Sequence, residues 1–147
     1  MMAFNDCAAQ TVEVRQVPGS VVAEDFKIYR PLIEASMEYE TEAIEIAEIF
    51  QHLRMNHWLC LIVVVNGKLR ALCICEQQKK RKGYALEIMM LAGEGMSEWL
   101  DHLLFEVVAI AEEFSCNALT LNGRLGWLPI LKQYGFEPQS QTLRMEI

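Results

Sequence analysis

Two β-rich runs joined by Asn66-Gly67 constrain the fold more than any other feature of this 147-residue chain. The runs are "WLCLIVVV" before the dipeptide and "KLRALCIC" after it. Asn-Gly is strongly favoured in two-residue hairpin turns, because both residues tolerate a positive φ angle. The sequence therefore predicts an antiparallel hairpin at this point. A second turn in "EQQKKRKG", followed by "YALEIMML", extends the hairpin to a three-strand meander.

The segment before the meander predicts one strand and two helices. Alternating polar and apolar residues in "TVEVRQV" indicate a strand that ends before Pro18-Gly19. Pro31 suits the first turn of one helix, and Thr41 is a candidate N-cap for the next. The apolar residues expected to face the core repeat at helical spacing; they are Leu32, Ile33 and Met37 in the first helix, and Ala43, Ile46, Ala47, Phe50 and Leu53 in the second.

The segment after the meander predicts a helix, a strand, a short helix and a final strand. Ser97 is a candidate N-cap for the long helix, which runs to about Phe114. The residues of this helix expected to face the sheet keep helical spacing; they are Leu100, Leu103, Leu104, Val107, Ala111 and Phe114. "NALTL" reads as a strand, a helix near 127–134 ends at Gly135, and "TLRMEI" closes the chain as a strand. The order β-α-α-β-β-β-α-β-α-β predicts a single α/β domain over residues 1–147, with a mixed, mainly antiparallel sheet.

Charge and composition narrow the classes of partner. The net charge is −7 and the pI is about 5.0, so neither nucleic acid nor an anionic membrane surface is an expected partner. Five cysteines without CxxC spacing and three scattered histidines predict reduced thiols and no metal site. No signal peptide and no bilayer-spanning run is evident, so a cytoplasmic location is expected. The basic cluster 79–82 is interpreted as a solvated turn.

A glycine-rich turn links the last strand of the meander to the long helix. "LAGEGMSEWL" places Gly93 and Gly95 before the helix N-terminus, where backbone N–H groups favour anions such as phosphate. Together with the element order and "ILKQYGFEP", this turn resembles the GNAT superfamily of N-acetyltransferases. The combination "GRLGW…LKQYGF" is also similar to small GNAT-like proteins encoded by bacteriophages.

The resemblance implies a GNAT-like domain with helices on both faces of the sheet. It also implies that acetyl-CoA is the cofactor and that an acetyl or acyl group passes to an amine of a small molecule or protein. The main chain from Met90 to Met96 is then expected to part from a neighbouring strand and to turn its amides toward the cofactor. The residues implied in cofactor binding are Met89, Met90, Leu91, Ala92, Gly93, Glu94, Gly95, Met96, Ser97 and Arg124.

This sequence departs from the family pattern at several of these positions. Met90 stands where the family has Gln or Arg. Glu94 and Glu98 would repel coenzyme A at a cost of about 1–4 kcal/mol. No Lys or Arg lies between Gly83 and Arg124, so Arg124 is the residue expected to offset the two carboxylates.

Two residues are the candidates for proton transfer. Glu87, in the strand before the turn, is the candidate base, and the alternative is a solvent-facing strand residue. Tyr134 is the candidate acid, although the family's Tyr position holds Leu131 here. Trp99 and Trp127 are expected either to line a cofactor cleft or to pack in the core.

A second function stays open at this point. The fold can be catalytically silent and act through protein contacts or self-association, as a phage accessory or virion-associated component. Its location would then be the host cytoplasm or the virion. Fold does not fix function, so the site has to decide between these two hypotheses.

Overall fold

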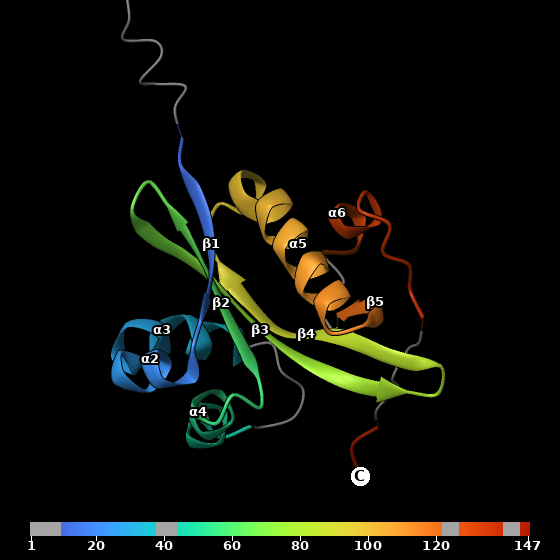
Figure 1. The fold of residues 1–147 in the computed structure, drawn as a ribbon, viewed down its shortest axis with the longest axis horizontal. Coiled ribbons are helices and arrows are strands. Elements are labelled where there is room, and N and C mark those ends of the chain that lie inside the picture. The colour runs from blue at the N-terminus through green and yellow to red at the C-terminus, as the bar shows by residue number, and fades with distance from the viewer. Residues whose placement is uncertain (1–9, 38–43, 122–126, 140–144) are drawn as a thin grey trace, which may run out of the picture.

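A five-stranded sheet lies between two layers of helices in the computed structural model, which describes residues 10–37, 44–121, 127–139 and 145–147 (Figure 1). The strands are β1 (Val12–Val17), β2 (Leu59–Val65), β3 (Lys68–Lys80), β4 (Gly83–Gly93) and β5 (Cys116–Leu121), and they lie in that order across the sheet. The first four are antiparallel to their neighbours, and β5 is parallel to β4. The predicted α/β class with a mixed, mainly antiparallel sheet is confirmed, but three helices lie between β1 and β2 where the sequence predicted two.

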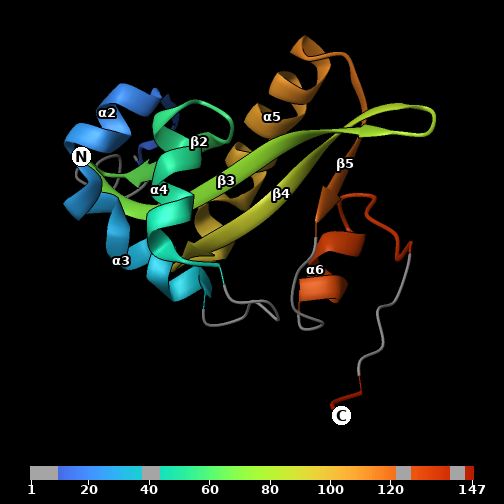
Figure 2. The same cartoon turned by 90° about the horizontal axis from the view of Figure 1, so that it is seen from below.

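The Asn66-Gly67 hairpin is confirmed. Asn66 and Gly67 have φ angles of 51° and 79°, the left-handed values that this turn requires. The second turn differs from the expectation, because β3 continues through Lys80 and only Arg81 and Lys82 separate it from β4. Figure 2 shows β3 and β4 extending to this turn beyond the helices. Residues 79–82 are exposed, as a solvated turn requires.

Each face of the sheet has its own core. Helices α2 (Gly19–Glu24), α3 (Phe26–Met37) and α4 (Ile46–Arg54) cover one face, where Val22, Ile33 and Ile49 are fully buried. Helix α5 (Met96–Glu113) covers the other face with Trp99, Leu103 and Val107, and α6 (Leu128–Lys132) lies beside it (Figure 1). Since successive strand residues point to opposite faces, the apolar runs of β2 and β3 supply both cores.

Several predicted boundaries are wrong. Pro31 lies in the middle of α3, because the helix already begins at Phe26; burial of the flanking Tyr29 and Ile33 offsets the hydrogen bond that a proline removes. Ser97 does not cap α5: it is the second helical residue, and Gly95 holds the N-cap position. Phe114 follows the end of α5 and is 39% exposed, so it is not a core residue.

Two predictions fall partly or wholly outside the described residues. Thr41 lies outside them, and α4 as described starts at Ile46 with Glu45 at its N-cap position. Most of the expected final strand also lies outside them, and residues 145–147 are not in a strand.

Candidate functional site

The glycine turn after β4 has the backbone geometry that the sequence predicted for Gly93 and Gly95. A Cβ atom on Gly93 would lie 2.5 Å from both the Cβ of Ala71 and the backbone oxygen of Arg70, so only glycine fits this close approach to β3. Gly95 adopts a left-handed conformation with φ 69° directly before α5. Both glycines are therefore required by the path of the chain, whatever the turn binds.

Some amides of this turn are engaged and others are available. The N–H of Glu94 donates to the backbone oxygen of Arg70 at 3.2 Å, which ties the turn to β3. The first amides of a helix lack intrahelical acceptors, and no acceptor for Met96 or Ser97 N–H occurs among the described residues. Gly93, Gly95 and Ser97 are exposed, so these donors face accessible surface at the positive end of the α5 dipole.

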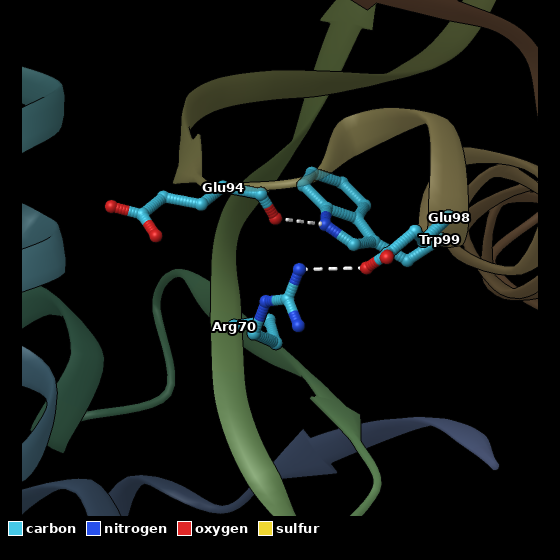
Figure 3. A network of polar contacts seen from close by, with 4 residues as sticks. All are labelled: Arg70, Glu94, Glu98 and Trp99. Atoms are coloured by element: carbon cyan, nitrogen blue, oxygen red, sulfur yellow. Dashed lines mark hydrogen bonds and ion pairs between the residues drawn. The ribbon is translucent and has the colours of Figure 1, made fainter. Parts of the chain in front are cut away.

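Arg70 brings a positive charge to the turn that sequence reasoning missed. Its Nη2 atom lies 2.6 Å from Oε2 of Glu98, and the two side chains are 31% and 38% exposed (Figure 3). Arg70 belongs to β3, where its neighbour Ala71 pairs with Gly93. A search for basic residues close in sequence to the turn could not find it. The only signal in the sequence was the pairing of β3 with β4 that can be counted along the predicted meander. The β-bulges of this sheet shift that pairing, so the count does not give the partner of Arg70.

The two acidic residues of the turn differ in placement. The carboxylate of Glu98 pairs with Arg70, whereas the side chain of Glu94 extends away from both residues (Figure 3). The backbone oxygen of Glu94 accepts a hydrogen bond of 2.7 Å from Nε1 of Trp99. Trp99 is fully buried, so it is a core residue that also fixes the turn. Trp127 is half-buried and packs against the same core.

The described residues show how β4 is paired on each side before the turn. On the β5 side the last described pair is Ile88 with Leu121, where the described part of β5 ends, and on the β3 side β4 is paired up to Gly93. Met89 is the extra residue of a β-bulge, since Ile74 pairs with Met90 and Cys75 pairs with Ile88. The expected parting is therefore absent on the β3 side, and on the β5 side it stays a prediction.

The side chains of this segment serve the two cores and do not line an open slot. Met90 is buried in the core under α2, α3 and α4, and Leu91 is buried in the core under α5. A ligand contact by the segment 89–92 would therefore involve its backbone N–H and C=O groups on the edge that faces away from β3. Arg124, the other residue implied in cofactor binding, lies outside the described residues.

A groove of about 1390 Å³ runs along β5, the edge strand of the described sheet, and residues of β4, β5, α5 and α6 line it. Of the predicted site residues, Glu87 and Tyr134 line it, and the turn 93–97 does not. Thr120, the strand partner of Glu87, also lines the groove. Its hydroxyl oxygen is buried without a hydrogen-bond partner among the described residues, which is an unusual state for a polar atom.

Glu87 belongs to a polar network on the sheet face that carries α2, α3 and α4. Nε2 of Gln78 lies 2.6 Å from Oε2 of Glu87 and 3.1 Å from Oε1 of Glu76. The other oxygen of Glu76 accepts a hydrogen bond of 2.8 Å from Nε1 of Trp58. Glu87 is half-buried, so it is not the fully solvent-facing strand residue of the alternative interpretation.

Tyr134 points its hydroxyl group at α5. The hydroxyl donates a hydrogen bond to Oδ1 of Asp101, and this bond, more than partial burial, raises the pKa of Tyr134 above its usual value. The side chain is therefore protonated at neutral pH, as a proton donor has to be. Its role as an acid stays a prediction, because the hydroxyl is held by Asp101.

Other parts of the described chain bear on metal, redox and membrane functions. Within residues 10–37, 44–121, 127–139 and 145–147, no three His, Cys, Asp or Glu side chains gather as metal ligands. Cys60, Cys73 and Cys75 are buried free thiols, and burial raises the pKa of Cys60 to about 12. None of the described helices has the length and apolar character to cross a bilayer.

Comparison with known proteins agrees with this architecture. No protein-family model and no curated protein matches the sequence. Solved structures do match: an aminoglycoside N-acetyltransferase in complex with CoA superposes with a TM-score of 0.72 at 9% identity, covering 95% of this chain and 96% of that one. A ribosomal-protein-alanine N-acetyltransferase from Brucella melitensis gives 0.71 at 14% identity, covering 93% and 99%.

A third match is a predicted acetyltransferase from Clostridium acetobutylicum, solved with acetyl-CoA. Its TM-score is 0.66 at 17% identity, and the alignment covers 92% of this chain and 96% of that one. At such identities a match establishes the fold, and the resemblance to phage-encoded proteins stays a prediction. The chain has the GNAT fold that these N-acetyltransferases share.

Proposed function

We propose that this protein is an N-acyltransferase that takes an acyl group from acyl-CoA and transfers it to an amine. The observation that carries the proposal is the glycine turn between β4 and α5, where the first amides of the helix are available. Solved structures of the same fold, one with CoA and one with acetyl-CoA, support the choice of cofactor.

The residues present fit such a cofactor. The edge of β4 at residues 89–92 that faces away from β3 would pair with the amide groups of the pantetheine arm. The turn 93–97 would hold the phosphates, because its amides and the α5 dipole favour negative charge. The neighbouring groove of about 1390 Å³ has room for more of the molecule.

Bound acyl-CoA would supply the acyl group as an activated thioester. Glu87 would accept the proton that the attacking amine loses, because it is a carboxylate that lines the groove. Gln78 donates a hydrogen bond to this carboxylate and so limits its rotation. Tyr134 would return a proton to the departing sulfur, which its protonated state at neutral pH allows.

The carboxylates around Glu87 favour an acceptor that carries more than one positive charge. Glu76 and Glu87 lie directly opposite each other in β3 and β4, so two carboxylates stand together on this face of the sheet. A polyamine or an amino sugar would complement both groups. Among proteins of this fold, aminoglycoside acetyltransferases have been solved with sisomicin and with CoA.

The direct test is titration of the purified protein with acetyl-CoA, followed by acetylation assays with a panel of mono- and polyamines. Saturable binding and release of free coenzyme A only in the presence of an amine would support the proposal. Absence of binding at millimolar acetyl-CoA would overturn it and favour a non-enzymatic role for the fold.

A further inference from the structure

The ion pair between Arg70 and Glu98 lies at the place where the turn would receive a phosphate. A Cβ atom built on Gly95 would lie 2.3 Å from Nη2 of Arg70 and 2.9 Å from Oε2 of Glu98. The ion pair therefore lies over Gly95, which ends the turn and directly precedes the first amides of α5. Figure 3 shows both charged groups together beside the turn, with the Glu94 side chain directed elsewhere.

We propose that Glu98 is a built-in competitor of the cofactor phosphate, and that Arg70 exchanges from Glu98 to that phosphate when acyl-CoA binds. The inference rests on the proposed acyl-CoA site and adds a control of its affinity. Glu98 places a carboxylate near the positive end of α5, where it makes the interaction that a phosphate would make. The free protein thus carries its own anion at the anion site.

The geometry allows such an exchange. The two side chains are 31% and 38% exposed, and ion pairs at this level of exposure contribute little to stability, so the pair opens readily. Only Nη2 of Arg70 contacts Glu98 among the described residues, which leaves Nε and Nη1 as further donors. An arginine also binds a phosphate through two parallel hydrogen bonds, which a single contact to one carboxylate oxygen does not match.

The chain offers a matched control for this idea. Glu94 and Glu98 are both exposed acids of the same turn, so replacing either by Gln removes one negative charge from the same region. Only Glu98 pairs with Arg70. A general charge effect would change both variants alike, whereas the proposed competition concerns Glu98 alone.

The experiment measures the Kd for acetyl-CoA by calorimetry in the wild type, Glu98→Gln, Glu94→Gln and Arg70→Met, at low and at high salt. We expect Glu98→Gln to bind about five- to tenfold more tightly and Arg70→Met about tenfold or more weakly, with both differences reduced at high salt. Glu94→Gln should tighten binding clearly less than Glu98→Gln, by about twofold, because its carboxylate is directed away from the pair and acts only through its general charge. Circular dichroism confirms that each variant is folded.

The outcomes separate this inference from the proposed function. If the wild type binds and Arg70→Met binds equally well, or if Glu94→Gln tightens binding as much as Glu98→Gln, the exchange is overturned while the acyltransferase proposal stands. If neither the wild type nor Glu98→Gln binds acetyl-CoA, the proposed function itself fails. Binding by Glu98→Gln alone would support both.

Discussion

Glu76 and Glu87 are direct partners across β3 and β4, and their carboxylates are joined by the side-chain amide of Gln78. Like charges directly opposite each other normally destabilise a pair of strands. Here one Nε2 group donates to both carboxylates, at 3.1 Å and 2.6 Å. The arrangement keeps two carboxylates together on one face of the sheet, and one of them, Glu87, lines the groove.

The Gln78→Leu variant should lose stability, because both carboxylates then lose a shared donor. The expected loss in the free energy of unfolding is about 0.5–1.5 kcal/mol, the usual worth of a hydrogen bond of this kind. Urea unfolding measures this loss. In a protein that already carries Glu76→Gln, the Gln78→Leu change should lower the free energy of unfolding by less, since one of the two charged groups is gone. An equal cost in both backgrounds would show that Gln78 does not act by bridging them.

The Glu87→Gln variant tests the proposed base. Loss of a general base lowers kcat by about 10²- to 10⁴-fold, while the KM for acetyl-CoA should change little because Glu87 lies outside the turn. Steady-state release of coenzyme A measures both values. Glu76→Gln is the matched control, and its kcat should fall far less. Comparable losses in the two variants would mean that the charge of the pair matters and that Glu87 has no separate role.

The Gly93→Ala variant should be severely destabilised. Its Cβ would meet Ala71 and the backbone of Arg70 at 2.5 Å, and its φ angle of 155° is one that side chains rarely adopt. We expect a loss of about 2–4 kcal/mol in the free energy of unfolding. Gly67→Ala is the control: it has φ 79° but no atom within 4 Å, so about 1 kcal/mol is expected. Equal losses would contradict the close approach of the turn to β3.

The hydroxyl of Tyr134 should ionise at a higher pH than an ordinary tyrosine, because its pKa is raised by the hydrogen bond to Asp101. A raised pKa in the folded state stabilises the protein below the unfolded value of about 10, and this contribution is lost as pH rises through the folded pKa. Ultraviolet titration of the wild type minus Tyr134→Phe isolates the group. In Asp101→Asn its pKa should fall, and an unchanged titration would rule out Asp101 as the cause.

A separate activity measurement addresses the proposed role of Tyr134. If Tyr134 returns a proton to the departing sulfur, Tyr134→Phe should lower kcat by about 10- to 10²-fold with little change in KM. A variant with the kcat of the wild type would show that the tyrosine only links the segment after α6 to α5.

Local sequence signals identified much of the fold. The Asn66-Gly67 turn, the apolar alternation of β1 and the spacing of Leu100, Leu103, Leu104 and Val107 in α5 were sufficient, because each acts within a few residues. The ends of the helices were harder to predict. The start of α3 depends on burial, and the N-cap of α5 depends on the left-handed conformation of Gly95, and residue propensities alone show neither.

The candidate site shows the same division. The position of the glycine turn and the carboxylates that accompany it could be predicted, because both are properties of consecutive residues. Which charges meet at the turn depends on the fold: Arg70 reaches it from a strand that pairs with β4, and the Glu94 side chain is directed away although Glu94 is part of the turn. Electrostatic interaction depends on distance in space, and strand pairing brings together residues that are far apart along the chain.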